Sequence, residues 1–232
     1  MPELLLVGNS RWHWAERRAG VLHCWHQDEP SEAPELSALQ LWAAVGAVPP
    51  QISLPPAREL QLQQIPLRGM PPWLGLDRAL AAWRAWTQQQ GPVLVVDAGT
   101  CLSFTCVDGS GAFLGGRLSP GLALQLRSLG QGTAQLPLLA PHAGDQVARE
   151  ALELWPQDTE TAMLQGCLKA MAAAVMQAVA DLPSPGGSAD GWTVWLTGGD
   201  APALSELLEP STASLRQAPN LCLEALAALA FS

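Results

Sequence analysis

The 232-residue chain is long enough for one large domain or two small ones, and its 48% hydrophobic content is sufficient for a packed core. A formal charge of −9 and an isoelectric point near 4.8 argue against an extended nucleic-acid interface or an anionic membrane surface. The chain contains a single lysine, Lys169, and no GxxxxGK[ST] sequence, which excludes a Walker-type phosphate loop. Any phosphate site must therefore be built without that lysine.

Five cysteines are scattered along the chain without a CxxC pair, which is typical of reduced thiols in a cytosolic protein. His23-Cys24-Trp25-His26 has no second ligand pair at a suitable spacing, which disfavours structural zinc. The N-terminal MPELLLVG is too short an apolar run for a signal peptide, and we expect no stretch with the roughly 20 apolar residues of a membrane span. These features predict a cytoplasmic protein.

The spacing of apolar residues, with Gly and Pro between the expected elements, predicts a chain in which strands and helices alternate. The expected strands are Glu3–Val7, Arg11–Ala15, Val21–Pro30, Ala47–Pro56, Val93–Val96, Leu102–Val107, Ala112–Leu118 and Trp192–Leu196. The expected helices are Ser31–Gly46, a helix opening at Trp73–Arg78 and continuing to Gln90, Leu122–Leu129, Thr161–Leu182, Ala201–Leu208 and Leu221–Ala230. Gly91-Pro92 marks the expected boundary between two halves.

The stretch from Val93 to Gly121 is the best candidate for a functional centre. Its first strand delivers Asp97 to a small turn, Ala98-Gly99-Thr100, and two further strands follow around Asp108–Gly111. A carboxylate beside a Gly-Thr turn, whose N–H groups can approach an oxyanion, suits a phosphate or metal-phosphate site. A hairpin in which Asp and Gly serve the turn alone is the alternative, and this stretch by itself leaves both open.

The N-terminal LLLVGNSRWHW repeats the design of VLVVDAGTCLSF: an apolar strand, a small-residue turn with a hydroxyl, and a second strand. A separation of about ninety residues indicates a duplicated unit rather than a short solenoid repeat. Two further features stand at element ends, Gly75-Leu76-Asp77-Arg78 at a helix start and Thr197-Gly198-Gly199-Asp200 after a strand. Each has a plain structural reading, as a solvated helix start or an ordinary α/β turn.

Taken in order, Gly8-Asn9-Ser10, Gly75–Arg78, Asp97–Thr100 and Thr197–Asp200 make the chain resemble the type III pantothenate kinase family. The family pattern is D-x-G-N-[TS], G-x-D-R, D-x-G-T-A, a GG-x-I-x-PG segment, a TAxLP segment and TGG. Gly115–Gly121 and Thr133–Pro137 match the two additional segments, so the resemblance covers nearly the whole chain.

This resemblance implies the fold of acetate kinase, sugar kinases, Hsp70 and actin. Two duplicated ribonuclease-H-like α/β halves with mixed five-stranded sheets, residues 1–90 and 91–232, would flank an ATP cleft. It implies a homodimer that transfers the γ-phosphoryl group of ATP to pantothenate, giving 4′-phosphopantothenate for coenzyme A biosynthesis. It also implies Mg²⁺ with the ATP and a monovalent cation, K⁺ or NH₄⁺.

The resemblance also implies the roles of individual residues. Asp77 would be the general base, and Gly75, Leu76, Asp77, Arg78 and Thr159 would bind pantothenate. ATP would contact Val7, Gly8, Asn9, Ser10, Arg11, Thr100, Thr197, Gly198 and Gly199, and Asp97 would hold the monovalent cation. From chemistry alone, either Asp77 or Asp97 could be base or cation ligand. Apart from the resemblance, Asp158 or Thr159 could serve only as the N-cap of the helix that follows.

Two positions depart from the family pattern. Leu6 stands where the first motif begins with Asp, and Cys101 stands where Ala is usual. Glu3 is no substitute for the missing carboxylate, because a residue three positions earlier on a strand faces the opposite side of the sheet. The alternatives are therefore a catalytically weak paralogue that binds nucleotide or pantothenate, and a kinase of the same fold acting on another hydroxylated acid.

Overall fold

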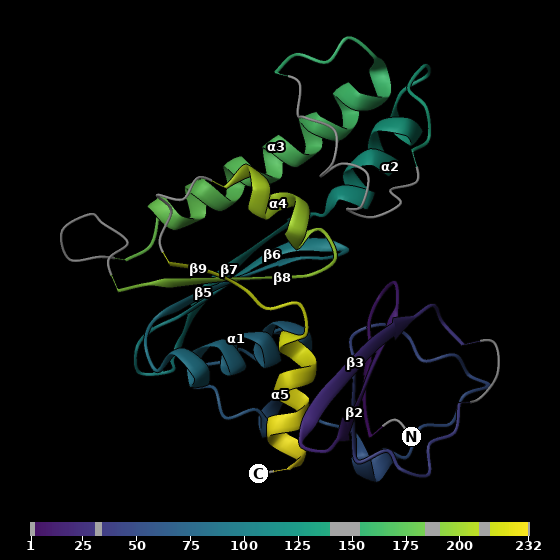
Figure 1. The fold of residues 1–232 in the computed structure, drawn as a ribbon, viewed down its shortest axis with the longest axis vertical. Coiled ribbons are helices and arrows are strands. Elements are labelled where there is room, and N and C mark those ends of the chain that lie inside the picture. The colour runs from purple at the N-terminus through teal and green to yellow at the C-terminus, as the bar shows by residue number, and fades with distance from the viewer. Residues whose placement is uncertain (1–2, 31–33, 140–153, 184–190, 209–213, 232) are drawn as a thin grey trace. The chain divides into compact units, whose positions relative to one another are not determined.

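The computed structural model describes residues 3–30, 34–139, 154–183, 191–208 and 214–231. Their order is β1 (Leu4–Val7), β2 (Trp12–Arg18), β3 (Val21–Gln27), β4 (Leu41–Ala44), η1 (Pro56–Arg58), η2 (Leu62–Gln64), α1 (Leu76–Gln89), β5 (Val93–Ala98), β6 (Cys101–Val107), β7 (Phe113–Pro120), α2 (Leu122–Gly132), α3 (Thr159–Ala180), β8 (Thr193–Thr197), α4 (Ala201–Leu207), β9 (Ser214–Gln217) and α5 (Leu221–Ala230) (Figure 1).

The chain forms two compact units. The first contains Met1–Gln90, Gly111–Phe113 and Asn220–Ser232, and the second contains Gly91–Ser110 and Leu114–Pro219. The change of unit after Gln90 falls at the expected boundary, but the C-terminal helix α5 belongs to the first unit, whereas we expected residues 91–232 to stay together.

The sheet of the first unit has the order β3-β2-β1-β4 among the described residues, where we expected five strands. β1 pairs antiparallel with β2 and parallel with β4. A two-residue turn, Ala19-Gly20, joins β2 to β3 with positive φ at both positions (49° and 82°), as a type I′ hairpin turn requires. This turn fixes the register of the two strands.

The two faces of this sheet are covered differently. One face buries side chains that alternate along the strands, and this core contains Leu5, Val7, Trp12, Trp14, Leu39, Trp42, Ile52 and Leu54. Helix α5 contacts all four strands and also packs along α1. Since residues directly opposite each other in an antiparallel pair share a face, Leu6 and His13 lie on the face away from Leu5 and Trp14.

Two expectations for the first unit are wrong. Residues 34–40 are irregular rather than helical, and the segment after them is the short strand β4. The expected strand Ala47–Pro56 is a proline-containing coil that runs into η1 and η2. Trp42 and Ala43 are buried in the sheet, so packing against β1 overrides the helix propensity of this Leu- and Ala-rich stretch.

The second unit is a five-stranded mixed sheet, β7-β6-β5-β8-β9, with α2, α3 and α4 over one face (Figure 1). β5 pairs antiparallel with β6 and parallel with β8. The core on the helix side joins Leu94, Val96, Leu102 and Phe104 of the sheet to apolar residues of the helices, among them Leu126, Met171, Val175 and Leu204. The expected strands and helices from Val93 to Thr197 are confirmed within two or three residues, and β9 is an addition.

Helix α3 is long and apolar enough to pass a test for membrane-spanning length and composition, contrary to our expectation that no stretch would. Half of that stretch is buried inside the protein. Cys167, Leu168, Met171 and Val175 all belong to the core of the second unit. The hydropathy of α3 is therefore explained by its place as the core helix of an α/β unit.

Candidate active site

The first candidate region lies at the end of β5, in the second unit. Asp97 is opposite Thr197 of β8 in the parallel pair, and Gly198 follows immediately. A Cβ built on Gly198 would lie 2.4 Å from the carbonyl carbon of Ala98 and 2.5 Å from Oδ1 of Asp97, and φ at Gly198 is +95°. Only glycine fits this position, since both the close approach and the positive φ exclude a side chain. The Asp97 carboxylate therefore lies directly against backbone.

The turn after Asp97 also carries the start of α2. The Gly121 N–H donates to the Thr100 carbonyl (3.1 Å), and a Cβ on Gly121 would lie 2.1 Å from the Gly99 carbonyl oxygen. Gly121 is the N-cap of α2 and has no side chain to offer to the first N–H groups. The turn Gly99-Thr100 and the positive end of a helix dipole thus come together, which is an environment that suits an anion.

Asp200 is a member of this region to which the sequence analysis gave no role. Its N–H donates to the Ala98 carbonyl (2.9 Å), so it ties the loop after β8 to the end of β5. Burial raises the pKa of its carboxyl, and a hydrogen bond from the Leu122 backbone opposes that shift. The sequence signal was the Asp that directly follows Thr197-Gly198-Gly199, but an ordinary α/β turn was an equally simple explanation for that motif.

The counterpart in the first unit is the turn after β1. The Gly8 N–H donates to the Arg11 carbonyl (3.0 Å), and the Val45 and Gly46 N–H groups donate to the Val7 carbonyl (2.9 and 3.2 Å). A Cβ on Gly46 would lie 2.2 Å from the Gly8 carbonyl oxygen. A glycine after the neighbouring parallel strand thus packs on this turn as Gly198 does in the second unit. Asn9, Ser10 and Arg11 are all exposed.

The end of β1 differs from the end of β5 in its chemistry. Leu6, at the position that corresponds to Asp97, is only 6% exposed and has no atom that can hold a cation. Opposite it on β2 is His13, whose pKa is lowered to about 4, mainly by burial and also by His26 and Arg11. The first turn therefore offers backbone donors and an apolar side chain, and the carboxylate of this duplicated motif survives only at Asp97.

The third region is the start of α1. Gly75 is its N-cap, and the Arg78 N–H donates to Oδ1 of Asp77 (2.8 Å). Burial raises the pKa of Asp77, while the hydrogen bond and the charge of Arg78 act in the opposite direction. A Cβ on Gly75 would lie 2.7 Å from Oδ1 of Asp77, so the glycine leaves room for this carboxylate. A half-buried carboxylate with a raised pKa is a stronger base than an exposed one.

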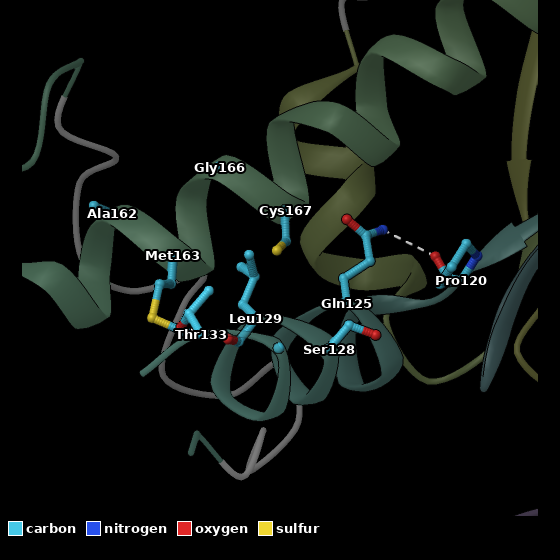
Figure 2. A pocket seen from close by; sticks show the side chains of 10 residues that line it. Pro120, Gln125, Ser128, Leu129, Thr133, Ala162, Met163, Gly166 and Cys167 are labelled. Carbon is cyan, nitrogen blue, oxygen red and sulfur yellow. Dashed lines mark hydrogen bonds between the residues drawn. The ribbon is translucent and has the colours of Figure 1, made fainter. Parts of the chain in front are cut away.

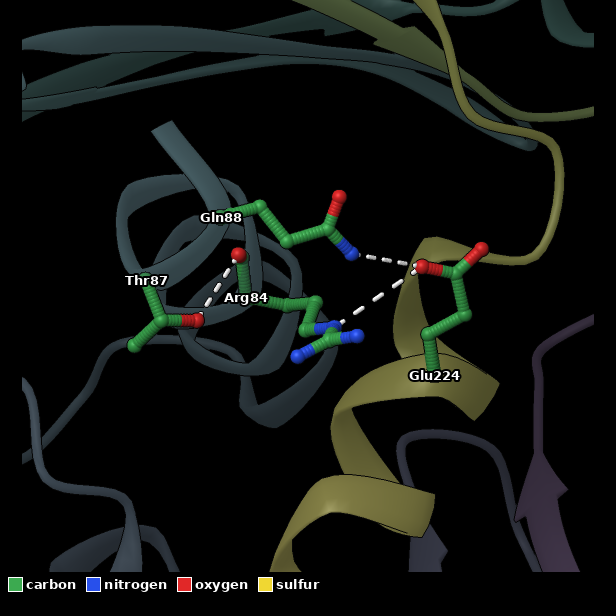
Figure 3. Close-up of polar contacts among 4 residues, drawn as sticks. All are labelled: Arg84, Thr87, Gln88 and Glu224. Atoms are coloured by element: carbon green, nitrogen blue, oxygen red, sulfur yellow. Dashed lines mark hydrogen bonds and ion pairs between the residues drawn. The ribbon is translucent and has the colours of Figure 1, made fainter. Parts of the chain in front are cut away.

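Contacts with α5 hold α1 in place. Gln88 donates to Glu224 (2.8 Å), and Nε of Arg84 lies 3.7 Å from the same carboxylate oxygen (Figure 3). At the other end of α1, the Cys222 thiol donates to the Asp77 carbonyl at 3.5 Å. The helix that bears Asp77 is thus fixed within the first unit by the C-terminal helix.

Thr159, the remaining expected substrate contact, begins α3 in the second unit. Asp158 is the N-cap, and its carboxylate accepts from the Thr161 N–H (2.8 Å), so the open choice between two caps resolves to Asp158. This hydrogen bond lowers the pKa of Asp158. Thr159 is exposed and its hydroxyl is not required for capping, which leaves it available to a ligand.

A cavity of about 490 Å³ lies between α2 and α3 (Figure 2). At one side of the cavity Gln125 donates to the Pro120 carbonyl (2.9 Å), and Thr133, Met163 and Cys167 also line it. Pro120 belongs to the expected GG-x-I-x-PG segment and Thr133 to the TAxLP segment. The structure therefore brings these two segments to one cavity, although they are a dozen residues apart in the chain.

Comparison with known proteins gives this geometry its context. A sequence profile described as type III pantothenate kinase matches residues 30–181. A type III pantothenate kinase of Synechococcus elongatus is 34% identical over 98% of this chain and 95% of its own length. The chain belongs to the type III pantothenate kinase family. A relative of that name from Thermosynechococcus vestitus is 41% identical over 88% of this chain and 79% of its own length.

As a member of this family, the chain is an ATP-dependent kinase, so the expected family and enzyme class are confirmed. A solved structure of the activator of 2-hydroxyisocaproyl-CoA dehydratase from Clostridium difficile, with bound ADPNP, matches 99% of this chain with a TM-score of 0.53 at 10% identity. That likeness concerns the fold alone, and it supports the expected class of duplicated α/β halves.

The expected site residues of this pantothenate kinase are divided between its two units. The first unit contains the Gly8 turn and the Gly75–Arg78 helix start, and the second contains Asp97–Thr100, Thr197–Gly199 and Thr159. Within the second unit, Asp97, Gly99 and Gly198 are in direct proximity. Among the described residues, no group of three or more His, Cys, Asp or Glu side chains is arranged to hold a metal ion.

Proposed function

We propose that this pantothenate kinase uses Asp77 as the general base that accepts the proton of the pantothenate hydroxyl as it attacks the γ-phosphorus of ATP. The products are 4′-phosphopantothenate and ADP, and the reaction is the first step of coenzyme A biosynthesis. The observation that carries the assignment is the raised pKa of Asp77 at the start of a fixed helix, beside Arg78. A base of this kind must lie within about 3 Å of the hydroxyl in the substrate complex.

Pantothenate recognition is assigned to Gly75, Leu76, Arg78 and Thr159. A guanidinium matches a carboxylate in two parallel hydrogen bonds, so Arg78 suits the carboxylate of pantothenate. The half-burial of Arg78 supports this role, since a partly desolvated charge interacts more strongly with an ion than a solvated one. Thr159 would supply a neutral hydroxyl contact from its exposed position.

ATP binding is assigned to backbone-rich turns in both units. Val7, Gly8, Asn9, Ser10 and Arg11 form one turn, and Thr100 with Thr197, Gly198 and Gly199 forms the other. The glycines at these turns have no Cβ, so backbone N–H groups can approach the phosphate oxygens. These N–H groups would take the place of the lysine that a Walker-type loop uses. Catalysis then depends on positioning and on charge neutralisation rather than on covalent chemistry.

Cations are assigned to the second unit. Asp97 is a carboxylate against bare backbone, a donor type that suits K⁺ or NH₄⁺ and also the water shell of Mg²⁺. Leu6 does not fit a hard cation, so Mg²⁺ would be held mainly by ATP oxygens and water. When bound, Mg²⁺ neutralises developing charge on the phosphates. Equal rates in K⁺ and Na⁺ would contradict a selective cation site at Asp97.

A catalytically weak, binding-only paralogue is the second candidate, and the buried Leu6 is the observation that favours it. A coupled ADP-release assay with Mg-ATP and K⁺, with and without pantothenate, separates the two. Pantothenate-dependent ADP release supports the kinase. Its absence in protein shown to be folded supports the paralogue and makes Leu6→Asp the next variant.

A kinase for another hydroxylated acid is distinguished by titration calorimetry with pantothenate and with sugar acids. Heat of binding for pantothenate is expected. Binding restricted to sugar acids would remove the pantothenate assignment while leaving the kinase fold and the ATP assignment intact.

We propose a homodimer in the cytoplasm, without nucleic-acid or membrane partners. The exposed side of α3 carries Ala162, Gly166, Ala170, Ala173 and Met176, a nearly uncharged surface that suits a second copy of the helix. The charge of −9 disfavours nucleic acid and anionic lipid. Light scattering should give a dimer mass for the wild type and a lower mass for Ala170→Glu, with Glu160→Gln as the control.

A further inference from the structure

Two histidines of the first unit face each other across neighbouring strands. His13 on β2 is directly opposite His26 on β3, and their Nδ1 atoms are 2.9 Å apart. The ring centroids are 4.8 Å apart, with the planes at 70° to each other. His13 is half-buried, whereas His26 lies on the edge strand of the sheet and is exposed. The pair is therefore supported on one side and open to solvent on the other.

The spacing of the two nitrogens fits a shared metal ion. Bonds from imidazole nitrogen to Zn²⁺ are about 2.05 Å long, so two such bonds at about 90° place their nitrogens about 2.9 Å apart. A tetrahedral angle places them about 3.3 Å apart, which requires an opening of a few tenths of an ångström. One N–H donating to the other nitrogen also explains the distance, and that alternative predicts no affinity for metal.

We propose that His13 and His26 form a two-histidine site for a divalent transition metal such as Co²⁺, Ni²⁺ or Zn²⁺. Imidazole nitrogen suits these borderline ions, whereas Mg²⁺ prefers oxygen. Arg11 places a positive charge near both rings, so the site depends on coordinate bonds rather than on attraction by negative charge. Water fills the remaining coordination positions.

The place of this pair gives it a link to the nucleotide turn. Leu6, His13 and His26 are consecutive partners across β1, β2 and β3, so their side chains share one face of the sheet. A Cβ on Gly8 would lie 3.2 Å from Nε2 of His13, so the ring also borders the Gly8 turn. Phosphate oxygens of ATP could then replace water on the metal, an extension that rests on the proposed function.

The test is titration of the tag-free, metal-free chain with Co²⁺, followed by visible absorption, and with Ni²⁺, followed by calorimetry. We expect one ion per chain, without the charge-transfer absorption that a thiolate ligand, the exposed Cys101 or the half-buried Cys24, would give. His26→Gln should weaken binding at least tenfold. Because His26 is exposed on the edge strand, this variant should fold like the wild type, and circular dichroism checks its fold.

His23→Gln is the matched control. His23 is also an exposed histidine of β3, but it lies three residues from His26 and so on the opposite face of the strand. It should bind like the wild type. Equal binding by the wild type and His26→Gln, or no binding by the wild type, would overturn the proposal.

The metal titration uses neither ATP nor pantothenate. Metal binding can therefore be found in a chain without kinase activity, and kinase activity in a chain that binds no metal. A second titration in the presence of a non-hydrolysable ATP analogue tests the extension. Tighter Co²⁺ binding with the analogue in the wild type, but not in His26→Gln, supports it. Unchanged binding would restrict the proposal to a metal site independent of the nucleotide.

Discussion

The two strand–turn–strand motifs of this kinase share a backbone plan and differ in chemistry. In each, a glycine after the neighbouring parallel strand packs on the turn, Gly46 in the first unit and Gly198 in the second. In each, the second-last strand position is paired on both sides, but it is Leu6 in one and Asp97 in the other. The duplication has thus preserved the backbone geometry and divided the chemistry, with the carboxylate on one side and an apolar residue beside two histidines on the other.

The largest effect is expected from Asp77→Asn, which removes the base and leaves both turns intact. Turnover should fall by about 10²- to 10⁴-fold, because an amide cannot accept the proton, while ATP binding by calorimetry stays near the wild-type value. Glu160→Gln, an exposed acidic residue in the first turn of α3, is the control and should be fully active. Retained activity in Asp77→Asn would move the base elsewhere.

Asp77 also gives a prediction for pH dependence. Because burial raises its pKa, the acid limb of kcat/KM should lie above the usual range of an Asp carboxyl. A raised folded-state pKa means that the stability contributed by this group is present at low pH and is lost as pH rises through that pKa. Asp77→Asn should therefore remove the acid limb and raise Tm at neutral pH; a lower Tm would contradict the burial argument.

The shared backbone plan is tested by Gly46→Ala and Gly198→Ala. Each places a Cβ within 2.5 Å of backbone, and Gly198 adds the strain of φ at +95°, so we expect losses of about 2 kcal/mol or more in denaturant unfolding, larger for Gly198. Gly199→Ala is the matched control, since among the described residues no atom lies within 4 Å of its added Cβ. Wild-type stability in Gly46→Ala would mean that the first turn lacks the tight packing of the second.

Recognition of pantothenate should respond more mildly. Arg78→Lys replaces a two-pronged donor with a point charge, so KM for pantothenate should rise about tenfold while KM for ATP stays nearly constant. Thr159→Ala should act in the same direction with a smaller effect. Initial-rate kinetics with each substrate varied in turn measure both KM values. An equal rise in KM for ATP and KM for pantothenate would contradict this assignment.

The smallest effect concerns the two hairpins. The β6–β7 turn uses a glycine at positive φ, Gly111 (79°), whereas the β2–β3 turn places Ala19 at 49°. Ala19→Gly should relieve the left-handed strain and raise the free energy of unfolding by up to about 1 kcal/mol. The greater entropy of glycine in the unfolded chain offsets part of this gain. Denaturant midpoints measure this, and a clear destabilisation would show that the alanine is not strained there.

Much of the second unit could be predicted from its sequence, because Val93–Val96, Leu102–Val107 and Thr161–Leu182 combine strong periodicity with clear Gly/Pro boundaries. The first unit was harder. Ser31–Gly46 has the composition of a helix, yet β4 is a four-residue strand whose conformation is set by pairing with β1. The strand β9 was missed because Ser214–Gln217 is short and mostly exposed.

The candidate site divides in the same way. Family motifs marked Asp77, Asp97 and the glycines. Asp200 was marked only by its place directly after Thr197-Gly198-Gly199, and its contacts depend on the close approach of β5 and α2. The pairing of His13 with His26 depends on the hairpin register set by Ala19-Gly20. In the sequence His26 is close to His23 and Cys24, whereas in the fold it lies opposite His13, thirteen residues away.

We expect Asp77 and the Asp97 turn to support pantothenate phosphorylation although β1 carries Leu6. Mass-spectrometric detection of 4′-phosphopantothenate, made by the wild type, Leu6→Asp and Asp97→Asn with Mg-ATP and K⁺, tests it most directly. We expect product from the wild type and a large loss of product in Asp97→Asn. Product from Leu6→Asp alone, with none from folded wild type, would contradict it.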